Sequence, residues 1–100
     1  MGTRVSWSPE AVEDVEAIAD YIAKDSPYYA SAVVQKLLMT AESLGQFPHI
    51  GSIVPEVGDP SFRERFVYSY RLIYRVTENE ILVVAVIHGR RLLAPLIERL

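Results

Sequence analysis

The chain has 100 residues, half of them apolar, which is enough for one domain with a single core. It contains no cysteine, so disulfides and thiolate chemistry are excluded and a reducing, cytoplasmic location is favoured. The net charge of −3 argues against nucleic-acid binding by bulk charge. The longest apolar run, residues 81–87, is too short to cross a bilayer, so we expect no membrane association. We expect one domain over residues 1–100, without a cofactor or a metal.

Two helices are predicted after a short N-terminal strand. Ser8 is placed as an N-cap with Pro9 at the first helical position, and Ser26 and Pro27 repeat this device. Apolar residues follow each start at helical spacing, and Gly45 is placed to end the second helix. The short link between them predicts an antiparallel helical hairpin.

Four segments have strand-like patterns: residues 3–7, 62–66, 70–76 and 80–88. Residues 77–79 form a tight turn, and the last strand, apolar on both faces, should lie inside the sheet. Residues 47–61 read as a long loop, either functional or a simple connector. Trp7 is predicted as a core residue beside Val5. The sequence thus predicts an α+β fold, with an N-terminal strand and an antiparallel helical hairpin on one face of a mainly antiparallel sheet (β-α-α-β-β-β).

A group of arginines stands out because the chain is acidic overall. Residues 62–75 hold one glutamate and four arginines, namely Arg63, Arg65, Arg71 and Arg75. A three-residue connection over 67–69 would pair Phe66 with Tyr70 and place all four on the face away from the helices. Arg90 and Arg91, after the last strand, would extend this arginine patch. Because clustered guanidinium groups repel one another, the patch predicts an acidic or phosphate-bearing partner.

Other interpretations of the polar residues stay open. The arginines could form an ordinary solvated strand face, with Glu64, Glu78 and Glu80 as weak ion-pair partners. His88 titrates near neutrality and is the best acid/base candidate, or else a strand-end residue bonded to backbone. His49 is predicted to be a loop residue without a chemical role.

Several motifs, taken in order along residues 4–91, resemble a known family. They are "SPEAVEDVEAIADYIAKDSP", "FPHIG", "FRERFVYSYRLIYRV" and "VIHGRR". Together they resemble the RelE/ParE superfamily of type II toxin–antitoxin toxins. The fold that this resemblance implies, a helical hairpin on one face of an antiparallel sheet, agrees with the periodicity.

The resemblance implies one of two activities. RelE-type members cleave mRNA on the ribosome, and for that activity Arg71 and Arg90 match phosphate-binding arginines. His88 would then act as acid or base, with Glu56 as a substitute for a family glutamate. Phe62 and Glu64, however, fall where such nucleases carry catalytic lysines. A family tyrosine expected after the "GRR" segment is also replaced by the apolar stretch 92–96.

ParE-type members resemble the chain more closely, and they inhibit DNA gyrase by protein contact, without a catalytic residue. The six arginines of the patch (Arg63, Arg65, Arg71, Arg75, Arg90 and Arg91) would then bind the target or the antitoxin. The resemblance implies a ParD-like antitoxin that folds on binding, giving a hetero-oligomer. A ribosome-dependent mRNA endonuclease is the alternative, and a non-toxic antitoxin-binding module is the second alternative.

Overall fold

The first strand leads directly into a helical hairpin. The computed structural model describes residues 2–89, 91, 97, 98 and 100, and it begins with β1 (Arg4–Trp7), α1 (Pro9–Ala23) and α2 (Pro27–Ser43). Ser8 Oγ accepts a hydrogen bond from the Ala11 N–H at 3.1 Å, and Ser26 Oγ accepts one from Tyr29 at 3.1 Å. Both predicted N-caps are therefore confirmed, because each side chain satisfies a backbone donor that the first helical turn leaves free.

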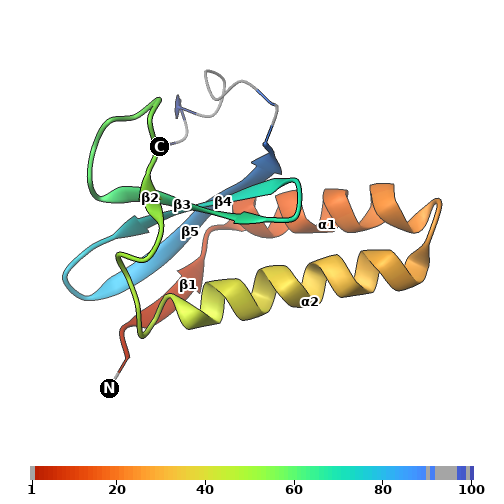
Figure 1. Cartoon of the computed structure of the whole chain (residues 1–100), viewed down its shortest axis with the longest axis horizontal. Helices are drawn as coiled ribbons and strands as arrows, with labels where there is room; N and C mark the ends of the chain where they lie inside the picture. Colours follow the sequence, from red (N-terminus) through yellow and green to blue (C-terminus); the bar gives the residue numbers. More distant parts are fainter. Residues whose placement is uncertain (1, 90, 92–96, 99) are drawn as a thin grey trace.

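The rest of the described chain builds a five-stranded sheet (Figure 1). It adds β2 (Ser52–Ile53), β3 (Phe62–Val67), β4 (Tyr70–Val76) and β5 (Glu80–His88), in the spatial order β1-β5-β4-β3-β2. Only β1 and β5 pair in parallel, and the other neighbours are antiparallel. The apolar β5 lies inside the sheet, as predicted. The short β2 was not predicted, since two residues carry no detectable alternation.

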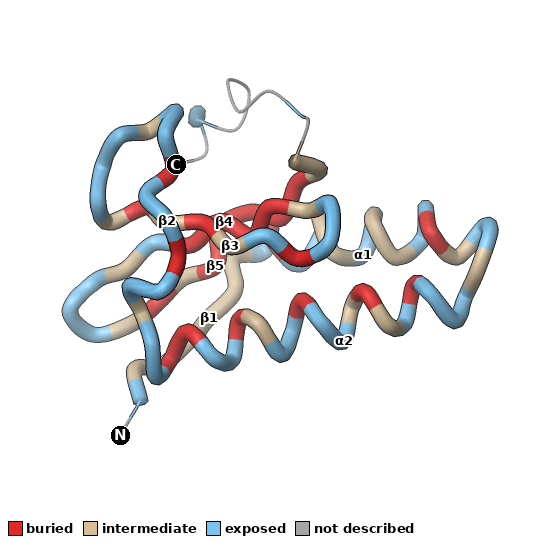
Figure 2. Tube along the Cα trace, viewed as in Figure 1, coloured by how far each residue is buried: buried red, intermediate tan, exposed pale blue. Residues whose placement is uncertain are grey.

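A main core lies between the helices and one face of the sheet, which we call the helix face. Sheet residues such as Val67, Leu72 and Tyr74 pack there against Val33 and Leu37 of α2. Val5 and Trp7 lie against the same core, which confirms the prediction for Trp7. In Figure 2 the buried positions of α2 lie along its side toward α1 and the sheet.

The opposite side of the sheet, the far face, carries a second and smaller core. Phe62, Ile73 and Ala85 are buried there against Val54, which comes from the segment between α2 and β3. We expected this face to be open, and that expectation was wrong. The segment 47–61 folds back over the far face, and its buried Val54 explains why the last strand is apolar on both sides.

The predicted pairing of β3 with β4 was also wrong by one residue. Val67 pairs with Tyr70, so the turn contains only Tyr68 and Ser69. Val67 consequently enters the main core at 3% exposure, whereas Phe66 is 61% exposed. Since a one-residue shift moves every side chain to the other face, the arginines of β3 and those of β4 lie on opposite sides of the sheet.

No helix in the described part of the chain is both long enough and apolar enough to cross a lipid bilayer.

Candidate functional site: a neutralised arginine and a tyrosine surface

Arg71 forms the centre of a buried ion cluster on the far face. Its Nε donates to Glu64 Oε1 at 2.8 Å, and its Nη2 contacts the same oxygen. Its Nη1 and Nη2 donate to the two oxygens of Glu56 at 2.8 and 2.9 Å. Arg71 is 6% and Glu64 is 9% exposed, whereas Glu56 is exposed at the surface. One guanidinium is thus shared by two carboxylates from β3 and from the preceding loop.

The electrostatics of this cluster follow from that sharing. The hydrogen bonds from Arg71 hold the pKa of Glu56 below its usual 4.5. The same contacts raise the pKa of Arg71, which stays charged under all ordinary conditions. With both carboxylates ionised, the three groups carry a formal charge of −1. A phosphate approaching Arg71 would meet carboxylates before it met the guanidinium.

Arg63 and Arg75, two other arginines of the predicted patch, do not gather around Arg71. Arg63 donates to three backbone carbonyls, those of Pro60, His49 and Gly51, at 3.1, 3.3 and 2.9 Å, and so fastens the segment 47–61 to β3. Arg75 places its guanidinium 5.6 Å from the centre of the Phe62 ring on the far face. The prediction of one continuous arginine surface is therefore wrong.

Arg65 differs from these three arginines. It pairs with Leu72 and therefore lies on the helix face. Its Nε is buried and makes no hydrogen bond within the described residues. Arg90 falls outside the described residues, and Arg91 is exposed near the end of β5.

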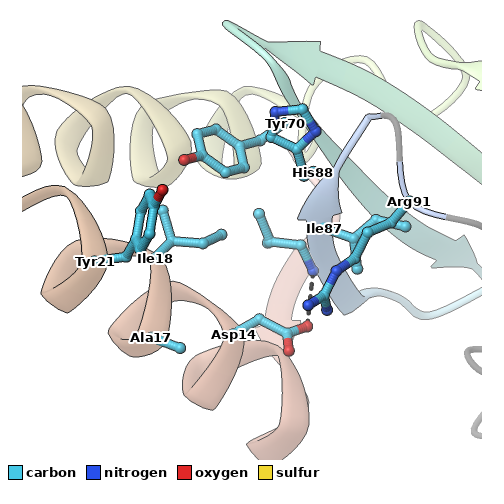
Figure 3. Close-up of a pocket in the computed structure, with 9 residues that line it drawn as sticks. Asp14, Ala17, Ile18, Tyr21, Tyr70, Ile87, His88 and Arg91 are labelled. Atoms are coloured by element: carbon cyan, nitrogen blue, oxygen red, sulfur yellow. Dashed lines mark hydrogen bonds between the residues drawn. The ribbon is translucent and has the colours of Figure 1, made fainter.

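His88 lies on the helix face, where its ring meets Tyr70 edge-on at 5.7 Å between centroids. A pocket of about 400 Å³ separates these rings from α1 (Figure 3). Asp14 borders it and accepts a hydrogen bond from the Val86 N–H at 3.0 Å. Arg91 extends toward Asp14 in the same view. His88 is thus a wall residue of a mixed polar and aromatic pocket. The side chain of His49 is exposed on the loop.

An adjoining pocket of about 380 Å³ reveals a surface that the sequence analysis missed. It is bordered by His88 and by four tyrosines, which we call the tyrosine surface: Tyr21, Tyr29, Tyr68 and Tyr70. The Tyr29 and Tyr68 rings lie 6.1 Å apart, which joins α2 to the β3–β4 turn. Burial raises the pKa of Tyr70, so its hydroxyl stays protonated and can donate. The sequence feature that could have indicated this surface is the presence of five tyrosines within residues 21–29 and 68–70.

Tyr68 has a backbone conformation that residues other than glycine rarely adopt. Its φ is +53°, and it is the sole non-glycine residue with positive φ among the described positions. The two-residue turn that creates this conformation also turns the ring outward, where it is more than half exposed. Strained residues of this kind are concentrated at binding sites.

Comparison with known proteins places the chain in a family. The family model described as "ParE toxin of type II toxin-antitoxin system, parDE" matches residues 5–93. Toxin RelE2 of Caulobacter vibrioides is 31% identical over 90 residues, which cover 89% of this chain and 98% of that protein.

Two solved structures share the fold. The chromosomal ParDE system of P. aeruginosa matches with a TM-score of 0.71 and 24% identity, over 86% of this chain and 95% of that chain. The RelBE2 complex of Mycobacterium tuberculosis matches with a TM-score of 0.59 and 20% identity, over 88% of this chain and 99% of that chain. On the sequence matches, this chain belongs to the ParE toxin family of type II toxin–antitoxin systems, within the RelE/ParE superfamily.

Proposed function

We propose that this protein is a cytoplasmic toxin that inhibits DNA gyrase by binding it, and that a ParD-like antitoxin neutralises it in a hetero-oligomeric complex. Membership of the ParE family supports the proposal. An antitoxin partner is further supported by the ParDE and RelBE2 structures that share the fold. A toxin of this type needs a shaped surface for a protein target and no catalytic group of its own.

The observation that carries the proposal is the separation of the nuclease candidates. Tyr70 and Arg71 are successive residues of β4, so their side chains point to opposite faces of the sheet. His88 pairs with Tyr70 and belongs to the helix face, whereas the Arg71–Glu56 pair lies on the far face. RNA cleavage requires its base, acid and phosphate-binding group to meet at one phosphate.

The chemistry of each candidate points the same way. A general base works best with a pKa near the working pH, but the contact with Arg71 lowers the pKa of Glu56. The guanidinium of Arg71 is already bound to two carboxylates. Glu64, at a position where RelE-type nucleases are expected to carry a lysine, is one of these carboxylates. The far-face cluster is therefore suited to holding β3, β4 and the loop together.

The tyrosine surface supports binding of a protein. Tyrosine combines a large apolar ring with a hydroxyl and few rotatable bonds, so it is favoured in protein interfaces. The four tyrosines come from α1, α2, the β3–β4 turn and β4. Tyr21 is 71% exposed and so is available for contact. We assign this surface to contact with the protein target.

A supercoiling assay tests the proposed target. Purified toxin added to DNA gyrase, relaxed plasmid and ATP should stop supercoiling and trap cleaved DNA. Toxin mixed beforehand with its antitoxin serves as the control and should leave gyrase active. Full gyrase activity at a large molar excess of folded toxin would refute the target.

The second candidate is a ribosome-dependent mRNA endonuclease. The 31% identity to toxin RelE2 favours it. Primer extension on mRNA from induced cells should then show new ends spaced by codons. If induced cells grow normally and neither assay responds, the protein is the third alternative, a non-toxic antitoxin-binding module.

A further inference from the structure

The pocket of the tyrosine surface, about 380 Å³ in volume, lies where several parts of the fold meet. One tyrosine comes from each of α1, α2, the β3–β4 turn and β4, and His88 of β5 adds a further ring. The hydroxyls of these four tyrosines make no hydrogen bond with any described residue. The pocket therefore presents aromatic rings together with oxygen atoms that can still accept a hydrogen bond.

Asp25 supplies this pocket with a carboxylate. It lies in the link between α1 and α2, where its N–H and that of Ser26 donate to the Ile22 carbonyl at 3.0 and 2.9 Å. Ser26 in turn caps α2 by accepting a hydrogen bond from the Tyr29 N–H. The carboxylate itself forms neither a hydrogen bond nor an ion pair within the described part of the chain. The backbone thus holds Asp25 at the pocket, and its negative charge is available to a ligand.

The charge around the pocket is negative. Within its bounds, α1 carries five acidic residues and no basic one. Of the described residues, no lysine or arginine borders the pocket. Lys24 is exposed beside Asp25, and Arg91 borders the adjoining pocket, where it extends toward Asp14 (Figure 3). Such a distribution attracts a cation and repels a phosphate.

The tyrosine rings strengthen the attraction for a cation. The face of an aromatic ring is electron-rich and attracts a cation that lies within about 6 Å of its centre. The rings of Tyr29 and Tyr68 are 6.1 Å apart and tilted by 55° to one another. In Figure 3 the hydroxyls of Tyr21 and Tyr70 point toward one another. A cation in the pocket would therefore meet rings or hydroxyl oxygens on several sides.

The open rim of the pocket favours a side chain of a larger partner over a free small ligand. Three of the tyrosines are exposed, Tyr21 at 71%, Tyr68 at 56% and Tyr29 at 47%. A site for a free small molecule normally encloses most of its ligand. Among cationic side chains arginine fits best, because its planar guanidinium stacks on aromatic rings and carries five donors for carboxylate and hydroxyl oxygens.

We propose that the pocket of the tyrosine surface is a cation site that receives an arginine side chain of the protein target, with the guanidinium paired to Asp25 and packed against the tyrosine rings. The identity of the partner as the toxin's target rests on the proposed function, whereas the chemistry of the pocket does not. Because α1 is acidic, the partner surface around this arginine is expected to be basic.

Nuclear magnetic resonance with two short peptides tests the site. The peptides are acetyl-Gly-Arg-Gly-amide and the same peptide with citrulline, which keeps the shape of arginine but carries no charge. We expect the arginine peptide to shift the ring signals of Tyr29 and Tyr68. It should also bind about fivefold more tightly than the citrulline peptide.

Three variants separate the parts of the site. Asp25→Asn removes the charge with little change of shape and should lower the preference for arginine to about twofold. Tyr29→Leu, which removes a ring but keeps an apolar side chain, should lower it as well. Asp20→Asn is the matched control and should leave the preference unchanged, because Asp20 is exposed on α1 and borders neither pocket. The amide spectrum shows in the same experiment that each variant is folded.

Three results would overturn the proposal. Equal affinity for the two peptides would exclude a cation site. A preference that survives in both Asp25→Asn and Tyr29→Leu would place the cation elsewhere. Larger shifts of the tyrosine ring signals with the dinucleotide TpT than with the arginine peptide would assign the pocket to a nucleic acid.

The peptide titrations contain no gyrase, so they distinguish a failure of this site from a failure of the proposed target. Equal peptide binding by a toxin that inhibits gyrase would refute the site and leave the target standing. A clear preference for arginine in a toxin without effect on gyrase would retain the site and assign the arginine to a different protein target. If gyrase is the target, Asp25→Asn should weaken its inhibition, whereas Asp20→Asn should not.

Discussion

Arg71 and Glu64 lie on adjacent strands and point to the same face of the sheet, where Arg71 Nε donates to Glu64 Oε1 at 2.8 Å. The two residues are 6% and 9% exposed, so the pair is almost completely removed from water. Together with Glu56, this pair gives Arg71 a structural role in place of the binding role that the arginine-rich stretch predicted. Arg71 is part of the structural framework, and the surface that we propose for binding lies on the helix face.

Removing the cation of this cluster should destabilise the protein. Arg71→Ala leaves the buried Glu64 carboxylate without a partner, so we expect the free energy of unfolding to fall by about 3 kcal/mol. Arg75→Ala, at an exposed position, is the matched control and should change it by less than about 0.5 kcal/mol. Urea unfolding measures both. The double variant Arg71→Met with Glu64→Leu should recover much of the lost free energy of unfolding. Similar free energies of unfolding for Arg71→Ala and Arg75→Ala would contradict a role for the cluster.

The cluster should also make stability depend on pH. The pKa of Glu56 is lowered from 4.5 in the folded protein, so its ionised form is favoured by folding. Its contribution is complete above about pH 4.5 and is lost as the pH falls through the folded-state pKa. The stability difference between the wild type and Glu56→Gln, measured by urea unfolding from pH 7 to pH 3, should therefore shrink below about pH 4.5. A difference that is constant over this range would show that the charge of Glu56 is not involved.

Tyr68 should affect binding more than folding. Glycine adopts positive φ without strain, so we expect Tyr68→Gly to preserve or raise the free energy of unfolding, by up to about 1 kcal/mol. The same change removes an exposed ring from the tyrosine surface and should weaken gyrase inhibition. Tyr28→Ala provides the control, because Tyr28 is 86% exposed. Tyr28 borders neither the pocket of the tyrosine surface nor the adjoining pocket beside α1. Full inhibition by folded Tyr68→Gly would exclude this surface from the contact.

His88 distinguishes the two activities. In a toxin that acts by binding, His88→Gln should change growth inhibition by about twofold at most, since it weakens the contact with Tyr70 and removes no reacting group. In a nuclease that uses His88 as acid or base, the rate should fall about 100-fold or more. Growth curves after graded induction, with toxin levels measured in parallel, separate these outcomes.

Local sequence was sufficient for the helices and for most strand positions. Ser8 and Ser26 each precede a proline and an apolar stripe, and capping acts within one helical turn, so the starts of α1 and α2 could be predicted. The uninterrupted apolar run of β5 likewise required burial on both faces, and β5 lies inside the sheet. These features depend on residues that are neighbours along the chain.

The register of β3 against β4, and with it the fate of the arginines, was decided only by the tertiary structure. Alternation fixes which residues of one strand share a face, but it does not tell which faces of two strands coincide. That choice depended on a two-residue turn with Tyr68 at positive φ, and on Glu56, which reaches Arg71 from a loop fifteen residues earlier. The carboxylates made it possible to bury Arg71, and this long-range compensation is what a pattern of neighbouring residues does not contain.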